Sequence, residues 1–220
     1  MSRKVFVSLA LVPAIAMLCG CGRNPLFFRL AANYYPVSPV GTQWDYELSG
    51  GGSLIVTVVD QTVKSQRGCY KIQRGTDYAY FVNEAGRLDH YEDHRVMFNG
   101  YEVPVYQSWV TYLEWPLTMG YCRTDTASAS TTVQGVTITH NWRRTVEVMG
   151  LETVSDSTGT WESCYHLRQA ERTIDWIQTG GYEPETTYVT RNIWLAPDVG
   201  MVKKTTPDST LVLSGYSPGQ

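Results

Sequence analysis

The sequence has no run of basic residues, and it has no long apolar stretch after residue 20. Clustered Lys and Arg are the usual footprint of a nucleic-acid-binding protein, so their absence and the formal net charge of −3 argue against a nucleic-acid partner. A membrane-spanning helix needs about 20 consecutive apolar residues. We therefore expect no membrane-spanning helix after the N-terminal segment.

Common catalytic motifs are also missing. There is no G-x-S-x-G turn for a serine hydrolase, and the glycine run at 50–52 lacks the lysine and the strand-to-helix context of a phosphate-binding loop. His140 and His166 stand alone among expected strand residues, where structural histidines are common. We therefore expect a non-enzymatic protein without a cofactor.

The N-terminus carries an export signal. Arg3 and Lys4 precede an apolar stretch at 5–18, which is the layout of a secretory signal peptide. The following Leu18-Cys19-Gly20-Cys21 resembles the lipobox of bacterial lipoproteins, which implies removal of residues 1–20 and lipidation of Cys21. Acyl chains contribute about 0.8 kcal/mol per buried methylene, so palmitate-type chains would anchor the protein to a membrane. An ordinary signal with a chance cysteine is the alternative.

The same resemblance implies where in the cell envelope the protein is located. Gly22, rather than aspartate, follows the lipidated cysteine, which implies transport to the outer membrane. Residues 21–33 would then form a lipidated tether. Loss of Arg3 and Lys4 from the 18 basic residues leaves 16 against 21 acidic ones, a net charge of −5 that suits a soluble domain in an envelope compartment.

Three cysteines remain after lipidation: Cys69, Cys122 and Cys164. The envelope is oxidising, so we expect one disulfide and one free thiol, although the sequence does not select the pair. A metal site is the alternative, but no C-x-x-C spacing supports it.

Residues 34–216 have the composition of one antiparallel β domain. Short runs of β-branched and aromatic residues alternate with Gly, Asn and Asp, and no stretch has sustained helical periodicity. Residues 105–113 are the best candidate for a short helix. The predicted fold is all-β, a curved sheet or barrel-like body with few short helices. The expected strands are 43–48, 54–62, 69–74, 78–82, 131–139, 143–151, 164–171, 186–195, 201–204 and 210–213.

Three motifs recur in the same order and indicate a duplication. They are a proline followed by a glycine, a Cys-Tyr pair at the start of a strand, and an aromatic strand that leads into a glycine turn. The two sets predict similar β units at 34–104 and 105–216, unless short β motifs coincide by chance. The first set is Pro36 to Gly41, Cys69-Tyr70 and 80–88, and the second is Pro116 to Gly120, Cys164-Tyr165 and 193–202.

The ends of the mature chain resemble a group of secreted bacterial lipoproteins. The opening has Tyr34-Tyr35-Pro36, then Gly41, Trp44 and Tyr46, and the closing stretch runs from Trp194 to Lys203. That family has a Tyr-Phe-Pro and Gly-x-x-Trp-x-Tyr opening and a Trp-x-Ala-Pro-x-Val-Gly-x-Val-Lys closing motif. The resemblance implies a β-rich fold like the curved sheets of lipoprotein carriers and an envelope address, and it transfers no catalytic residue. The second half departs from the pattern, because Arg123 stands where the motif would put tryptophan.

Two groups of residues are candidates for a site. Trp109, Trp115 and Trp176 have polar or loop neighbours and could line an apolar or sugar-binding cleft. On a strand, His90, Glu92 and His94 would share one face and could approach a metal ion, although a solvated polar segment explains them without one.

The leading hypothesis is a lipid-anchored protein that binds an envelope protein or an apolar ligand. A structural or assembly subunit of an envelope complex is the alternative, and a metal-dependent hydrolase using His90 or His94 ranks below both.

Overall fold

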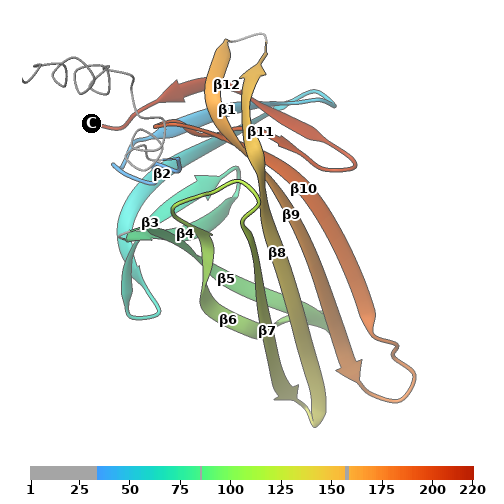
Figure 1. Cartoon of the computed structure of the whole chain (residues 1–220). Helices are drawn as coiled ribbons and strands as arrows, with labels where there is room; N and C mark the ends of the chain where they lie inside the picture. Colours follow the sequence, from blue (N-terminus) through green and yellow to red (C-terminus); the bar gives the residue numbers. More distant parts are fainter. Residues whose placement is uncertain (1–33, 85, 157–158) are drawn as a thin grey trace, which may run out of the picture. The chain divides into compact units, whose positions relative to one another are not determined.

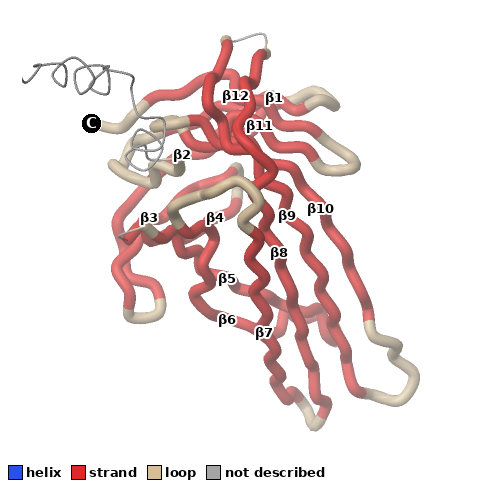
Figure 2. Tube along the Cα trace, viewed as in Figure 1, coloured by secondary structure: helices blue, strands red, loops and turns tan. Residues whose placement is uncertain are grey.

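A computed structural model describes residues 34–84, 86–156 and 159–220. Within these ranges the chain forms 12 strands and no helix (Figures 1 and 2). The predicted all-β, barrel-like fold is confirmed, and the described residues include no helix that could cross a membrane. The predicted signal at 1–20, the lipidation site Cys21 and the tether at 21–33 lie outside the described residues.

All twelve strands belong to one antiparallel sheet. The first six are β1 (Gln43–Leu48), β2 (Ser53–Lys64), β3 (Arg67–Arg74), β4 (Asp77–Glu84), β5 (Arg87–Phe98) and β6 (Tyr101–Glu114). The other six are β7 (Cys122–Val133), β8 (Val136–Ser155), β9 (Thr160–Gln178), β10 (Glu185–Ala196), β11 (Gly200–Thr205) and β12 (Thr210–Ser217). The long strands β8, β9 and β10 run well past the ends of β11 and β12 (Figure 1).

The topology is a meander whose first and last strands pair. The order across the sheet is β6-β5-β4-β3-β2-β1-β12-β11-β10-β9-β8-β7, so β6 and β7 are its edges. The sheet curls until side chains bridge these edges. Arg123 on β7 lies 3.1 Å from Glu114 on β6, and Arg144 on β8 donates a hydrogen bond to the carbonyl of Thr111 on β6. The body is therefore nearly closed, with its opening between β6 and β7.

Two predicted elements were wrong. Residues 105–113, the helix candidate, lie within β6, where antiparallel pairing with β5 uses their β-branched and aromatic side chains. The single strand expected at 131–139 contains a hairpin turn, because Gln134 and Gly135 both adopt positive φ and reverse the chain between β7 and β8.

The recurring motifs occupy equivalent places in the two sets of six strands. The Cys-Tyr pairs lie on β3 and β9, the third strand of each set, and each proline-glycine segment comes just before the first strand. The turn glycines Gly86 and Gly200 both have positive φ, at 86° and 96°. Common ancestry of the two halves remains a prediction.

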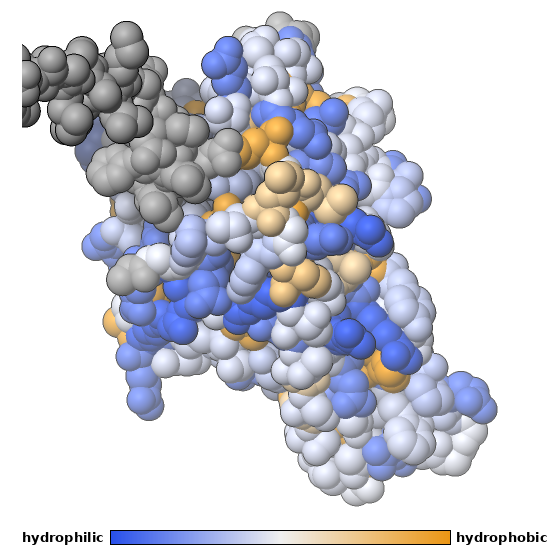
Figure 3. All heavy atoms as spheres, in the orientation of Figure 1, coloured by the Kyte–Doolittle hydropathy of each residue, from blue (hydrophilic) through white to orange (hydrophobic). Residues whose placement is uncertain are grey.

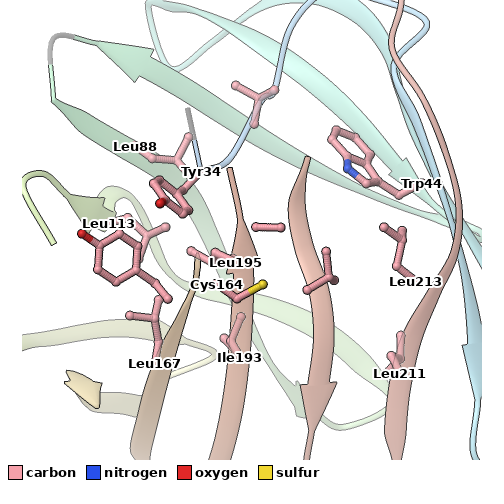
Figure 4. Close-up of a cluster of buried hydrophobic side chains, with 14 of the residues drawn as sticks. Tyr34, Trp44, Leu88, Leu113, Cys164, Leu167, Ile193, Leu195, Leu211 and Leu213 are labelled. Atoms are coloured by element: carbon pink, nitrogen blue, oxygen red, sulfur yellow. The ribbon is translucent and has the colours of Figure 1, made fainter. Parts of the chain in front are cut away.

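The larger of two apolar clusters, the large core, lies inside the curl. Its residues come from strands far apart in the sequence, including β1, β5, β9, β10 and β12 (Figure 4). Trp44 and Tyr46 bury their rings there and donate hydrogen bonds to the carbonyls of Val199 and Met201, at 2.6 and 2.9 Å. The small core, at the far end of the long strands, consists of Phe98, Val103, Val105 and Ile138.

The three cysteines in the described residues are free, which differs from the expected disulfide. Cys69 on β3 and Cys164 on β9 are buried, and six places separate their strands in the sheet order. Cys122 is exposed at the start of edge strand β7. Each thiol is thus held by its own strand, away from a partner.

Candidate functional site

A polar layer separates the two cores inside the curl. Side chains that point inward along β5, β8 and β9 belong to the large core at one end of each strand, at Leu88, Val148 and Leu167. They reach the small core around Phe98, Ile138 and Ile177. Between these ends the inward residues are mostly polar. The polar layer consists of His90, Glu92 and His94 on β5, His140 and Arg144 on β8, and Gln169, Glu171 and Asp175 on β9.

The half of this layer nearer the large core lines a cavity of about 270 Å³, which we call the polar cavity. Aromatic and apolar side chains form part of its wall, among them Tyr35, Phe81 and Tyr112. The remaining wall is strongly charged. Its formally charged residues are four cations, Arg74, Arg144, Arg191 and Lys204, and two carboxylates, Glu92 and Glu171.

The two carboxylates each approach one of these cations. Arg191 lies 3.7 Å from Glu171, and Arg144 lies 3.8 Å from Glu92. Burial raises the pKa of Glu92, but the hydrogen bond from His90 and the nearby arginine charges outweigh burial and lower it below its usual value. Glu92 is therefore ionised at neutral pH.

Lys204 is a cation in a positively charged environment. Burial, together with repulsion from Arg191 and Arg74, lowers its pKa to about 8, although the charge of Glu171 acts in the opposite direction. No ion pair within 4.0 Å forms at Lys204 or Arg74 among the described residues. The polar cavity thus has an excess of positive charge that a bound anion would neutralise.

Arg144 is the most deeply buried charge of the layer, with 1% of its surface exposed. Its guanidinium faces the rings of Trp142 and Tyr112, with centroid distances of 4.9 and 5.7 Å. Its Nε is buried without a hydrogen-bond acceptor among the described residues. A buried charged donor without a partner is costly, which favours an acceptor from a ligand.

The other half of the layer is a cluster of His94, His140 and Asp175. Asp175 accepts a hydrogen bond from His140 Nδ1 at 2.7 Å and one from His94 Nε2 at 3.0 Å. The two imidazole rings stack with centroids 3.8 Å apart. Burial raises the pKa of the Asp175 carboxyl, but the two histidine hydrogen bonds outweigh burial and hold it well below its usual range.

The two candidate histidines of β5 have different partners in the structure. His90 pairs with Glu92 at 3.1 Å, as their shared strand face predicts. His94 lies on the same face, about 13 Å further along the strand, and contacts Asp175 instead. No sequence pattern indicates this contact, because 81 residues separate the two positions.

The three candidate tryptophans do not gather at one site in the described residues. Trp109 on β6 packs edge-on against Tyr91, with ring centroids 5.3 Å apart. Trp115 follows β6 and packs against the large core, whereas Trp176 on β9 is 42% exposed. None of the three is among the described residues that line the polar cavity.

The polar cavity was also missed, since its charged residues come from six strands. One local signal existed, because Arg144, Gln169 and Glu171 occupy inward positions that alternate with outward ones along β8 and β9. Charged residues at such positions break the usual pattern of a half-buried strand. Figure 3 shows a mainly hydrophilic or neutral outer face with only scattered apolar patches, so polarity of the surface alone did not reveal the site.

Comparisons with known proteins give two similar structures. No protein-family model matches the sequence, and a search of curated proteins gives no match. The chain is similar to a protein of Parabacteroides distasonis named as a lipoprotein, with 13% identity, 84% of this chain and 99% of that chain covered, and a TM-score of 0.48. It is also similar to the hypothetical lipoprotein YmcC of Escherichia coli, with 12% identity, coverage of 97% and 100%, and a TM-score of 0.36.

Proposed function

We propose that this protein is a lipid-anchored lipoprotein of the outer membrane that binds a small anionic molecule in the polar cavity. The anchor is supported by the lipobox-like Leu18 to Cys21. The binding role is supported by one observation above all, the excess of four cations over two carboxylates around a cavity of about 270 Å³. This volume suits a small metabolite rather than an acyl chain or a peptide.

The positive charge of the polar cavity also favours anionic ligands over apolar ones. An apolar ligand, the class expected from the sequence, would leave Lys204 and Arg74 desolvated without a partner, which is unfavourable. A carboxylate or phosphate ester would accept charge-assisted hydrogen bonds from them, while the rings of Tyr35, Phe81 and Tyr112 would contact its carbon skeleton. We therefore assign the site to anions with an organic body.

Calorimetric titration of the full-length protein in detergent tests the binding role. Citrate, glucuronate and glucose 6-phosphate serve as probes, and Lys204→Met is compared with Lys203→Met. Lys203 is the matched control, because it is the next residue on β11 and its ammonium group stacks over Trp194 instead of lining the cavity. We expect at least one probe to bind, with about 10- to 100-fold weaker affinity after loss of a charge-assisted contact from Lys204.

Two results would contradict the binding role. One is absence of binding by every probe, and the other is an equal loss of affinity in both lysine variants. The anchor is tested separately, by mass spectrometry of the N-terminal peptide and by labelling with a palmitate analogue. Cys21→Ser should abolish the label and release the protein from membranes, and a label that persists would place the modification elsewhere.

A further inference from the structure

The second half of the polar layer has the chemistry of a cation site. We propose that His94, His140 and Asp175 bind a divalent transition-metal ion, with zinc as the ion of best fit. In the described part of the chain this is the one group of three or more His, Cys, Asp or Glu side chains whose ligand atoms lie within 4.8 Å of one another. The proposal stands independently of the anion site, because the two sites use different side chains.

The spacing of the ligand atoms suits a tetrahedral ion. Zinc binds histidine nitrogen and carboxylate oxygen at about 2.0–2.2 Å, which puts ligand atoms about 3.3 Å apart in a tetrahedron. Asp175 Oδ1 lies 2.7 Å from His140 Nδ1 and 3.1 Å from His94 Nε2. Entry of the ion would therefore require the carboxylate oxygen to move away by about 0.2–0.6 Å. The two rings, now stacked at an interplanar angle of 24°, would also tilt so that each points a nitrogen at the ion.

The donor atoms are also of the right kind. Two imidazole nitrogens and one carboxylate oxygen are ligands that zinc commonly uses. Because an ionised carboxylate only accepts hydrogen bonds, both ring nitrogens that face Asp175 now carry protons. On metal binding each ring would carry its proton on the other nitrogen, and the ion would replace the two hydrogen bonds.

The surroundings combine rigidity with access. His140 has 3% of its side chain exposed and stacks on His94, with Tyr106 stacked beyond it at 5.8 Å. His94 and Asp175 are 32% and 22% exposed, so the cluster opens to solvent on their side. A water molecule or a ligand atom could complete the coordination from there.

The bound ion would join distant parts of the sheet. His94 lies on β5, whereas His140 and Asp175 lie on the paired strands β8 and β9. These strands face one another across the interior of the curl, and the small core lies just beyond the cluster. We therefore expect the ion to hold β5 against β8 and β9 and to raise the stability of the curled form.

Titration of the metal-depleted, full-length protein with Zn²⁺ and Co²⁺ tests the site. The informative variants are Asp175→Asn and His94→Gln, since both positions are partly exposed and amides keep a hydrogen-bonding group. His166→Gln is the control, because His166 bonds Glu152 and Asn192 away from the cluster. Thermal unfolding of each metal-free variant establishes that it folds. If Asp175→Asn does not fold, the metal affinity of His94→Gln tests the site instead.

We expect one Zn²⁺ per chain, visible d–d absorption typical of four-coordinate Co²⁺, and a higher unfolding temperature with metal. Affinity should fall at least about tenfold in both cluster variants and stay unchanged in the control. Anomalous scattering from a zinc-soaked crystal should give a peak among the three side chains. Absence of binding, equal affinity in the cluster variants, or a peak elsewhere would overturn the proposal and leave the cluster a hydrogen-bonded support of the interior.

Discussion

Replacement of Arg144 by methionine should destabilise the curled sheet by about 2 kcal/mol. A hydrogen bond from a charged donor to a carbonyl, here that of Thr111, is worth about 1.5–3 kcal/mol. The variant also removes a cation 3.8 Å from Glu92 and 3.9 Å from Asp125. Removal of the buried, unpaired Nε should raise stability by on the order of 1 kcal/mol. This gain partly offsets the loss of the hydrogen bond and of the nearby charge pairs.

Thermal unfolding followed by circular dichroism measures this loss. For a domain of this size about 2 kcal/mol corresponds to a fall of about 4–8 °C in Tm. Arg143→Met is the matched control, because Arg143 is the preceding residue, is exposed, and should change stability by less than about 0.5 kcal/mol. Hydrogen exchange should accelerate on edge strand β6 in the Arg144 variant alone. Equal melting of the two variants would refute the idea that Arg144 holds the sheet opening together.

Three further predictions concern single residues. The lowered pKa of Lys204 means that the unfolded chain binds its proton more tightly, so stability should rise between about pH 8 and pH 10.5, and pH-dependent unfolding of Lys204→Met should lack that rise. Cys122 should react quickly with a thiol reagent in the native protein, whereas Cys164, whose pKa burial raises to about 11, should react only on unfolding; a rapid phase that survives in Cys122→Ser would contradict this. Gly200→Ala should lower stability by about 1–3 kcal/mol in denaturant unfolding, because φ is 96° and a Cβ would meet Pro36 at 3.3 Å; unchanged stability would show that the turn adapts.

The sequence predicted the class of fold because alternation along strands is a local property. Residues 43–48 were predicted as the strand that the structure contains, since Trp44 and Tyr46 alternate with polar residues. Errors arose where a local pattern was ambiguous. Residues 105–113 include Trp109 and Tyr112, whose spacing fits a helical face, yet pairing with β5 extends them. Tertiary pairing outweighed the weak local signal there.

The site was less predictable because its contacts are nonlocal. The pairing of His90 with Glu92 follows from positions two apart on one strand. Contact between His94 and Asp175 requires the curl of the whole sheet, which places β5 opposite β9, and no pattern within β5 indicates the direction of that curl. The sequence identified the right strand face of His94 without identifying its partners.

The composition of the polar layer supports the proposal that the interior binds ligands. Apolar residues at its positions would join the large and small cores into one, whereas burial of Arg144 and His140 needs partners on other strands. The layer is divided by charge, with excess cations next to the large core and the Asp175 carboxylate next to the small core. Lys204→Met and Asp175→Asn should therefore each impair one ligand and spare the other. If either variant lost both the anion and the metal, loosening of the curl, and not a lost ligand contact, would be the cause.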